Sequence, residues 1–372
     1  MTIDSKKRVV IKIGSSSLTS RHGEISRRKL EKLVEEIVQL KDEGHEVLLV
    51  SSGAVAAGYR KLGLNEKPNT LPEKQASASI GQSLLMEVYS EYFLSHGYVA
   101  SQILITRDDF LNEDRYNNAR NTINLLLDHG IVPIINENDT VTVNRIRFGD
   151  NDTLSAKVAA LIDADMLIIL SDIDGLYDGD PRKHLHTKRL EHVHEITTSI
   201  EAAAGDSGSA VGTGGMKSKM DAFKIAMASG IPAFLGKAGT PNILRDAVEQ
   251  KAKGTYFTSN KKFIRLNSKK QWIAFHSGPR GEVMVDEAGK VVIVEKKGCL
   301  QLANIKDVKG HFNKGEVVKI LHQNGKEIGL GIINYSSEQL ADPKDLSEKE
   351  SIPAVDSNHL VCHLGVSTPI NI

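Results

Sequence analysis

The stretch 131–157, IVPIINENDTVTVNRIRFGDNDTLSAK, constrains the fold more than any other part of the chain. It opens with a short apolar run, IVPII, which is typical of a fully buried strand. The polar groups NEND and GDND follow, and an alanine-rich helix is predicted from Thr153 to Asp163. Ligands of open α/β sheets bind beyond the carboxyl ends of the strands. The stretch therefore predicts an α/β sheet with a ligand site at this edge, although a series of Asx turns would use the same residue types.

Short apolar runs alternate with amphipathic helical patterns through the first two thirds of the chain. This alternation indicates a mostly parallel sheet that is covered by helices on both faces. The strands are expected at 9–13, 46–50, 99–105, 131–135, 166–170 and 231–235, and further helices at 27–42, 73–96, 116–129, 216–229 and 242–249.

The composition changes after about Lys251, so we expect two domains. Residues 1–255 form the α/β domain, a lysine-rich linker spans 256–270, and 271–372 form a small β-rich domain. In the last segment the runs VMVDEAGKVVIVE and EVVKILHQNGKEIGLGII contain Ala-Gly and Asn-Gly pairs, which predict hairpin turns.

The charge and cysteine content exclude several classes of protein. Lys plus Arg and Asp plus Glu both number 47, so no net field attracts nucleic acid or a membrane surface. Cys299 and Cys362 are too few for a disulfide framework. The chain has neither a signal-type segment nor an apolar run that could span a bilayer, and we expect a cytoplasmic protein. Four histidines with i, i+2 spacing favour surface positions over a metal site: His184, His186, His192 and His194.

Several predicted strand ends carry residues suited to binding phosphate. They supply Lys12 with Gly14, Ser52 with Gly53, Asp139 with Asn151 and Asp152, and Ser171 with Asp172, while the glycine-rich loop 205–215 leads to Lys219. Small residues after a strand let backbone N–H groups approach a phosphate. A solvated lysine beside a turn is an equally good interpretation of Lys12 alone, and a flexible connector is the alternative for the loop. No histidine occurs at these junctions, which disfavours acyl hydrolysis by a catalytic triad.

Lysines and glycine-backed amides without a histidine base are typical of phosphoryl transfer, where positioning and charge neutralisation dominate. A carboxylate acceptor, with an ordinary pKa of about 4.3, is ionised at neutral pH and needs no general base. Its approach to a nucleotide is opposed by charge repulsion. Two lysines beside the transferred group, held by one aspartate, would relieve that repulsion, with Mg²⁺ carried by the nucleotide phosphates.

Six segments in this order resemble the glutamate 5-kinases of the amino-acid kinase family, over residues 8–255. They are VVIKIGSSSLT, LLVSSGAVAAG, IVPIINENDTV, FGDNDTLSA, LSDIDGLYDGDP and VGTGGMKSKM. The region from about Lys269 resembles the PUA domain that many bacterial members carry. The resemblance implies an αβα sandwich around a mainly parallel sheet. It also implies transfer of the ATP γ-phosphoryl group to the side chain of L-glutamate, giving L-glutamyl 5-phosphate, the first step of proline synthesis.

The resemblance also implies roles for individual residues. Lys12 and Lys219 would flank the transferring group, and Asp152 would orient them. Ser52, Asp139 and Asn151 would bind glutamate, with Asp139 facing the α-ammonium group. The ATP site would comprise Lys12, Gly14, Ser171, Asp172, Thr213, Gly214, Gly215, Met216, Lys217, Ser218 and Lys219, without a protein-bound metal.

Partners and regulation follow from the resemblance too. The family suggests a homodimer or homotetramer, and contact with glutamyl-phosphate reductase would fit its pathway. Proline is expected as a feedback inhibitor, but Arg145 and Arg147 stand where some relatives carry acidic or neutral residues, so a proline-insensitive member is the alternative.

Two other functions compete with this prediction. Related kinases act on acetylglutamate, aspartate, carbamate or a nucleoside monophosphate, and Asp139 disfavours those substrates that lack a free ammonium group. An RNA-binding protein is the second alternative, because PUA domains elsewhere bind RNA and lysines are dense at 261–270. Trp272 is the only tryptophan, and RNA readers usually stack bases on aromatic side chains, so RNA binding is disfavoured.

Overall fold

The computed structural model describes residues 6–20, 24–142, 151–179, 186–204, 215–259, 267–341 and 352–362. The chain divides into two compact units, the first formed by Met1–Asp109 and Asp114–Ile264 and the second by Phe110–Glu113 and Arg265–Ile372. Within the described ranges, no helix has both the length and the apolar character needed to cross a membrane.

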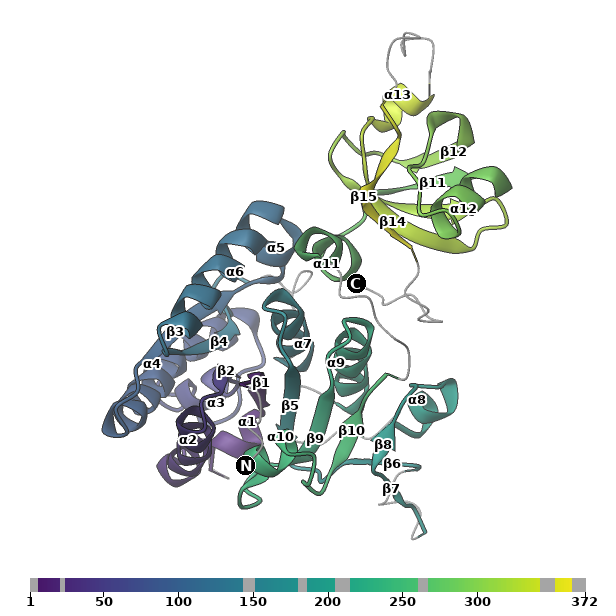
Figure 1. The fold of residues 1–372 in the computed structure, drawn as a ribbon. Helices are drawn as coiled ribbons and strands as arrows, with labels where there is room; N and C mark the ends of the chain where they lie inside the picture. The colour runs from purple at the N-terminus through teal and green to yellow at the C-terminus, as the bar shows by residue number, and fades with distance from the viewer. Residues whose placement is uncertain are drawn as a thin grey trace. The chain divides into compact units, whose positions relative to one another are not determined.

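An eight-stranded sheet forms the centre of the first unit, with the strand order β3-β4-β2-β1-β5-β9-β10-β8 (Figure 1). The strands are β1 (Arg8–Ile13), β2 (Glu46–Val50), β3 (Ala100–Ile105), β4 (Val132–Glu137), β5 (Met166–Ser171), β8 (His192–Val193), β9 (Ala233–Lys237) and β10 (Thr255–Phe257). Of the adjacent pairs, only β9 and β10 run antiparallel. The prediction of a mainly parallel sheet is confirmed. A separate two-stranded ribbon joins β6 (Leu176–Tyr177) and β7 (Arg189–Leu190).

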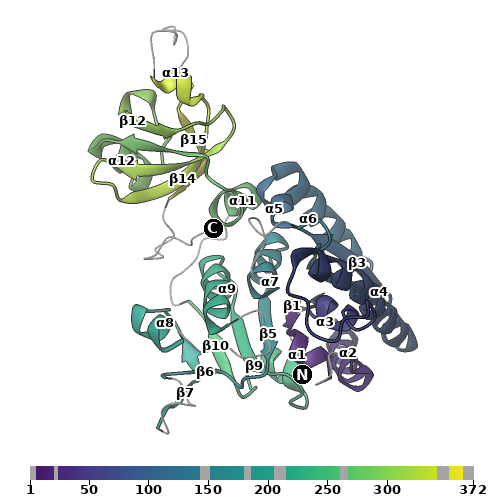
Figure 2. The ribbon, with the colours of Figure 1, turned by 180° about the vertical axis from the view of Figure 1, so that it is seen from behind.

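Helices cover both faces of this sheet, as predicted. On one face α2 (Arg27–Asp42), α3 (Ala54–Gly58), α4 (Leu71–Ser95) and α10 (Ile243–Val248) share a core with Ile11, Ile13 and Leu170. On the other face α7 (Asn151–Leu161) and α9 (Met216–Ala228) pack side by side against β1, β5 and β9 (Figures 1 and 2). The remaining helices of this part of the chain are α1 (Ser15–Leu18), α5 (Arg107–Leu111), α6 (Glu113–Asp128) and α8 (Thr198–Ala204).

Several predicted boundaries in the first unit differ from those of the structure, and two of the differences bear on the site. Strand β4 continues through Asn136 and Glu137, both buried, instead of ending at Ile135. Helix α7 begins at Asn151, not at Thr153, so Asn151 and Asp152 belong to its first turn. Tyr256 and Phe257 lie in the predicted linker, yet together with Thr255 they form the buried strand β10, because pairing with β9 completes their backbone hydrogen bonds.

The second unit contains a five-stranded sheet with the order β12-β11-β13-β14-β15. Its strands are β11 (Gly281–Val285), β12 (Ile305–Gly310), β13 (Val317–His322), β14 (Glu327–Ile333) and β15 (Val355–Cys362), with helices α11 (Ser268–Phe275), α12 (Glu287–Val294), α13 (Ser337–Ala341) and the 3-10 turn Leu302–Asn304. The predicted β-rich domain is confirmed, and so is the Asn-Gly turn, where Gly325 has a φ of 83°.

The predicted hairpin at the Ala-Gly pair is wrong, because EAGKVVIV forms helix α12. Asp286 caps this helix by accepting a hydrogen bond from the Gly289 N–H group at 2.8 Å. A local cap thus overrides the strand preference of the valines. Trp272 is 7% exposed and donates its Nε1 hydrogen bond to the Phe110 carbonyl, so it offers no open face for base stacking.

Candidate active site

Three charged side chains meet inside the first unit at the carboxyl ends of the strands. Lys12 Nζ lies 2.6 Å from Asp152 Oδ1, and Lys219 Nζ lies 3.0 Å from Asp152 Oδ2. Asp152 is fully buried and each lysine is 6% exposed. The three residues predicted to act together are therefore in contact, with the acid between the two ammonium groups.

Three different elements carry this triad. Lys12 is near the end of β1, while Asp152 and Lys219 occupy the first turns of α7 and α9. Because α7 and α9 pack side by side, their N-termini bring the two residues together. Ser218 Oγ adds a longer contact to Asp152 Oδ2, at 3.3 Å, and donates to the Gly215 carbonyl at 2.8 Å.

The electrostatics of the triad keep the acid ionised. Burial by itself would raise the pKa of the Asp152 carboxyl, but the adjacent ammonium groups of Lys12 and Lys219 outweigh it and hold that pKa below its usual value. Each ammonium group has three N–H donors, and the contact with Asp152 uses one of them. The remaining donors can bind an anion that enters the site.

Glycines shape the two turns next to the triad. Gly53 follows β2 with a φ of 101°, a left-handed conformation that favours glycine. A Cβ atom on Gly53 would lie 3.7 Å from Ser15, so the turns after β1 and β2 lie close together. Gly14 precedes Ser15, and a Cβ atom there would lie 3.8 Å from Lys12 Nζ. Both turns thus border the lysine.

A cluster of amide and hydroxyl groups adjoins the triad through Asn151. The two hydrogens of Asn151 Nδ2 are shared among three acceptors, Ser52 Oγ at 3.0 Å, Asn136 Oδ1 at 2.8 Å and the Ser51 carbonyl at 2.5 Å. Asp139 follows β4 in a turn and is half-buried. Asn151 and Asp152 are consecutive residues, so the charged triad and this neutral cluster meet at the start of α7.

The predicted nucleotide residues are only partly described. Ser171 ends β5 and donates to Asp172 Oδ1 at 3.0 Å. Gly215 caps α9, with Met216 and Lys217 in the first turn. Thr213 and Gly214 lie outside the described residues, as do Arg145 and Arg147. A helix N-terminus whose N–H groups lack partners in the helix is suited to a phosphate.

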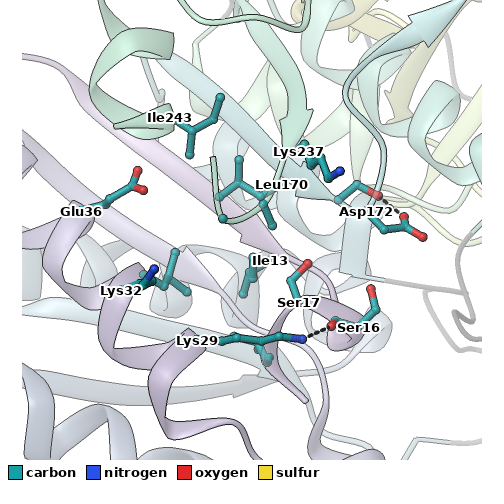
Figure 3. A pocket seen from close by; sticks show the side chains of 15 residues that line it. Ile13, Ser16, Ser17, Lys29, Lys32, Glu36, Leu170, Asp172, Lys237 and Ile243 are labelled. Atoms are coloured by element: carbon teal, nitrogen blue, oxygen red, sulfur yellow. Dashed lines mark hydrogen bonds between the residues drawn. The ribbon is translucent and has the colours of Figure 1, made fainter. Parts of the chain in front are cut away.

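Ser171 and Asp172 also border a pocket of about 280 Å³ (Figure 3). Its floor is apolar, with Ile13 and Leu170 among its lining residues, and its rim carries Lys29, Lys32 and Lys237. The other lining residues are Ser16, Ser17, Leu18, Leu33, Glu36, Ala238, Gly239 and Ile243. Because α2 and α10 supply part of the wall, the pocket lies on the sheet face opposite to α7 and α9.

Comparison with known proteins identifies the fold of the first unit. The model of the family described as "Amino acid kinase family" matches residues 7–237. The chain belongs to the amino acid kinase family. The PUA domain model matches residues 281–352. Bacillus licheniformis glutamate 5-kinase 2 is 63% identical over 98% of this chain and 99% of its own length. Bacillus subtilis glutamate 5-kinase 2 is 62% identical over the whole of both chains.

A solved kinase structure has the same fold as the first unit. Carbamate kinase from Giardia lamblia, bound to AMP-PNP, aligns with a TM-score of 0.50 over 69% of this chain and 99% of that protein. The sequence identity is 18%, so the likeness concerns the fold alone.

The sequence did not single out two residues that adjoin the candidate site, Asn136 and Gln82. Asn136 belongs to the polar stretch after the apolar run, and its position in β4 next to Asn151 emerges only from the fold. Gln82 lies in the middle of α4, where no sequence signal separates it from other polar helix residues. Within the described part of the chain, no three His, Cys, Asp or Glu side chains are arranged to hold a metal ion.

Proposed function

We propose that this protein is a glutamate 5-kinase, which transfers the γ-phosphoryl group of ATP to the side-chain carboxylate of L-glutamate. The observation that supports it most is the buried Lys12–Asp152–Lys219 triad at the end of the sheet. Relatives that carry this name are 62% and 63% identical over nearly the whole chain. The product would be L-glutamyl 5-phosphate, the first intermediate of proline synthesis.

In this mechanism an oxygen of the glutamate side chain attacks the γ-phosphorus. An O–P bond forms, the bond from phosphorus to the β–γ bridging oxygen breaks, and ADP leaves. The attacking carboxylate, with an ordinary pKa of about 4.3, is already ionised, so no proton has to be removed. Lys12 and Lys219 reduce the repulsion between the two anions, because both ammonium groups are fixed by one carboxylate.

The substrates would bind on either side of the triad. We assign glutamate to Ser52, Asp139 and Asn151, with the Asp139 carboxylate facing its α-ammonium group. ATP would bind Gly14, Ser171, Asp172 and the segment from Thr213 to Lys219. Both oxygens of Asp152 contact lysines, which fits Mg²⁺ entering with the nucleotide phosphates instead of binding this acid. Magnesium would neutralise charge on the β- and γ-phosphates.

The experiment that tests this function is ADP release from purified protein with a panel of amino acids. We expect activity with L-glutamate and Mg²⁺, and none with aspartate, N-acetylglutamate or carbamate. Activity with N-acetylglutamate but not with glutamate would exclude the proposed substrate. Adding proline to the same assay tests feedback inhibition, and light scattering tests the proposed homodimer or homotetramer. Mixing with glutamyl-phosphate reductase before gel filtration tests that contact.

A further inference from the structure

A chain of four side-chain amides connects strand β3 with the start of helix α7. Asn151 Nδ2 donates to Asn136 Oδ1 at 2.8 Å, Asn136 Nδ2 to Gln82 Oε1 at 2.9 Å, and Gln82 Nε2 to Gln102 Oε1 at 3.3 Å. All four amides are oriented alike. In each hydrogen bond the nitrogen belongs to the residue nearer α7 and the oxygen to the residue nearer β3. Such chains polarise one another and strengthen each bond.

Close helix packing brings Gln82 into this chain. Its neighbour Gly81 faces Gly58 of α3, and a Cβ atom on Gly81 would lie 1.8 Å from the Ala54 carbonyl oxygen. A Cβ atom on Gly58 would lie 1.9 Å from the Ser77 carbonyl oxygen. Only glycine at both positions permits this approach of α4 to α3, which follows the turn that carries Ser52.

Asn136 is the member whose orientation matters most. It is 3% exposed, and its Oδ1 accepts hydrogen bonds from both Asn151 Nδ2 and the Glu137 N–H group. A flipped Asn136 amide would turn its NH₂ group toward two donors. Gln82 Oε1 is the acceptor for Nδ2 in the present orientation. Loss of that acceptor removes the bond that favours this orientation and leaves a buried donor without its partner.

The donor-to-acceptor direction of the four linked amides determines which polar atoms of Asn151 and Ser52 are available to a ligand. Since Asn151 donates through Nδ2, its Oδ1 faces elsewhere and, within the described ranges, accepts no hydrogen bond. Ser52 Oγ accepts from Asn151, so its own hydrogen is available to donate. One acceptor and one donor side by side complement the ammonium and carboxylate groups of a free amino acid.

We propose that Gln82 is a positioning residue for amino-acid binding, which rests on the proposed glutamate kinase function. It acts through Asn136 to fix the direction in which Asn151 and Ser52 present their polar atoms. Gln102 is the solvent-exposed last member of this series of amides. It supports the orientation of Gln82 and contributes less to amino-acid binding than Gln82 does.

The test compares Gln82→Met with the parent protein by steady-state kinetics and by calorimetric titration of glutamate without nucleotide. We expect KM and Kd for glutamate to rise about tenfold, with KM for ATP and kcat within about twofold of the parent. Gln82→Glu keeps an acceptor for Asn136 Nδ2, so its KM for glutamate should be within about threefold of the parent value. Gln102→Met should raise the KM for glutamate only about twofold.

Gln39→Met, on the exposed side of α2, is the matched control and should change nothing. An unchanged glutamate KM in Gln82→Met overturns the proposal. So does an equal loss in Gln82→Met and Gln82→Glu accompanied by a lower Tm, because that result indicates a purely structural role. If the parent protein does not bind or phosphorylate glutamate, the proposed function fails, and the calorimetric arm separates that outcome from failure of the inference.

Discussion

Lysines on the two faces of the first unit's sheet differ in how they are held. Lys12 and Lys219, on the α7 and α9 face, are 6% exposed and lie 2.6 and 3.0 Å from one buried carboxylate. Lys32 and Lys237, at the rim of the pocket in Figure 3, are exposed and have no ion pair among the described residues. Lys12 and Lys237 both stand near the carboxyl end of a strand, β1 and β9. The difference shows that a fixed acid, and not the strand end, gives a lysine a defined position.

The largest effect is expected from removing one ammonium group of the triad. Lys219→Met should lower kcat about 10²- to 10³-fold, because one of the two ammonium groups proposed to stabilise the transferring phosphoryl group is lost. ADP release measures the rate, and circular dichroism checks that the variant folds. Lys237→Met is the matched control. If both variants lose activity equally, the contrast between the two faces is wrong.

The second prediction concerns a charge that would be paired by the substrate. Asp139→Ala should raise KM for glutamate at least about tenfold, since the α-ammonium group loses its counter-charge, and should leave KM for ATP nearly unchanged. Steady-state kinetics with each substrate varied in turn separates the two constants. An unchanged glutamate KM would remove the role assigned to Asp139 and would reopen the choice among amino acid kinase substrates.

The third prediction uses Lys157, a buried lysine of α7. Burial, with a smaller contribution from Arg107, lowers the pKa of Lys157 to about 7. Between this value and the ordinary 10.5 the unfolded chain binds a proton that the folded chain does not, so folding becomes more favourable as pH rises. Relative to Lys157→Met, the parent should gain up to about 1.4 kcal/mol of unfolding free energy per pH unit above pH 7.

Denaturant unfolding of the parent protein and of Lys157→Met at pH 7, 8 and 9 measures how the difference in their unfolding free energies changes with pH. Asp152 should change stability in the same direction, but at lower pH, because its pKa is also lowered by folding. Its lowered pKa gives stability that is complete above the unfolded value and is lost as pH falls through the folded value. A parent curve that runs parallel to that of Lys157→Met would show that Lys157 keeps its proton.

Sequence patterns predicted much of the first unit, because its strands and helices have clear periodicity. Helix α2 and strand β2 begin and end at the predicted residues. The errors lie where tertiary contacts decide, as in the start of α7 at Asn151 and in strand β10, which forms by pairing with β9. Helix α12 was missed because a side-chain cap outweighed the strand propensity of its valines.

The site was predicted in part. Resemblance brought together Lys12, Asp152 and Lys219, which are far apart in the sequence and in contact in the fold. Composition could not reveal Gln82, because a glutamine inside a helix has no pattern of its own, and its approach to Asn136 depends on the packing of α3 against α4. Sequence patterns alone therefore do not predict which side chains from distant segments come into contact.

The smallest effect is expected at the pocket. Lys237→Met should change kcat and both KM values less than about twofold, because its exposed ammonium group, which has no ion pair within the described ranges, is screened by water and salt. The measurement also bears on Ser171 and Asp172, which border both this pocket and the proposed ATP site. A rise in KM for ATP alone would place Lys237 beside the nucleotide. The two faces of the sheet would then act together through the end of β5, although only one holds its lysines with a buried acid.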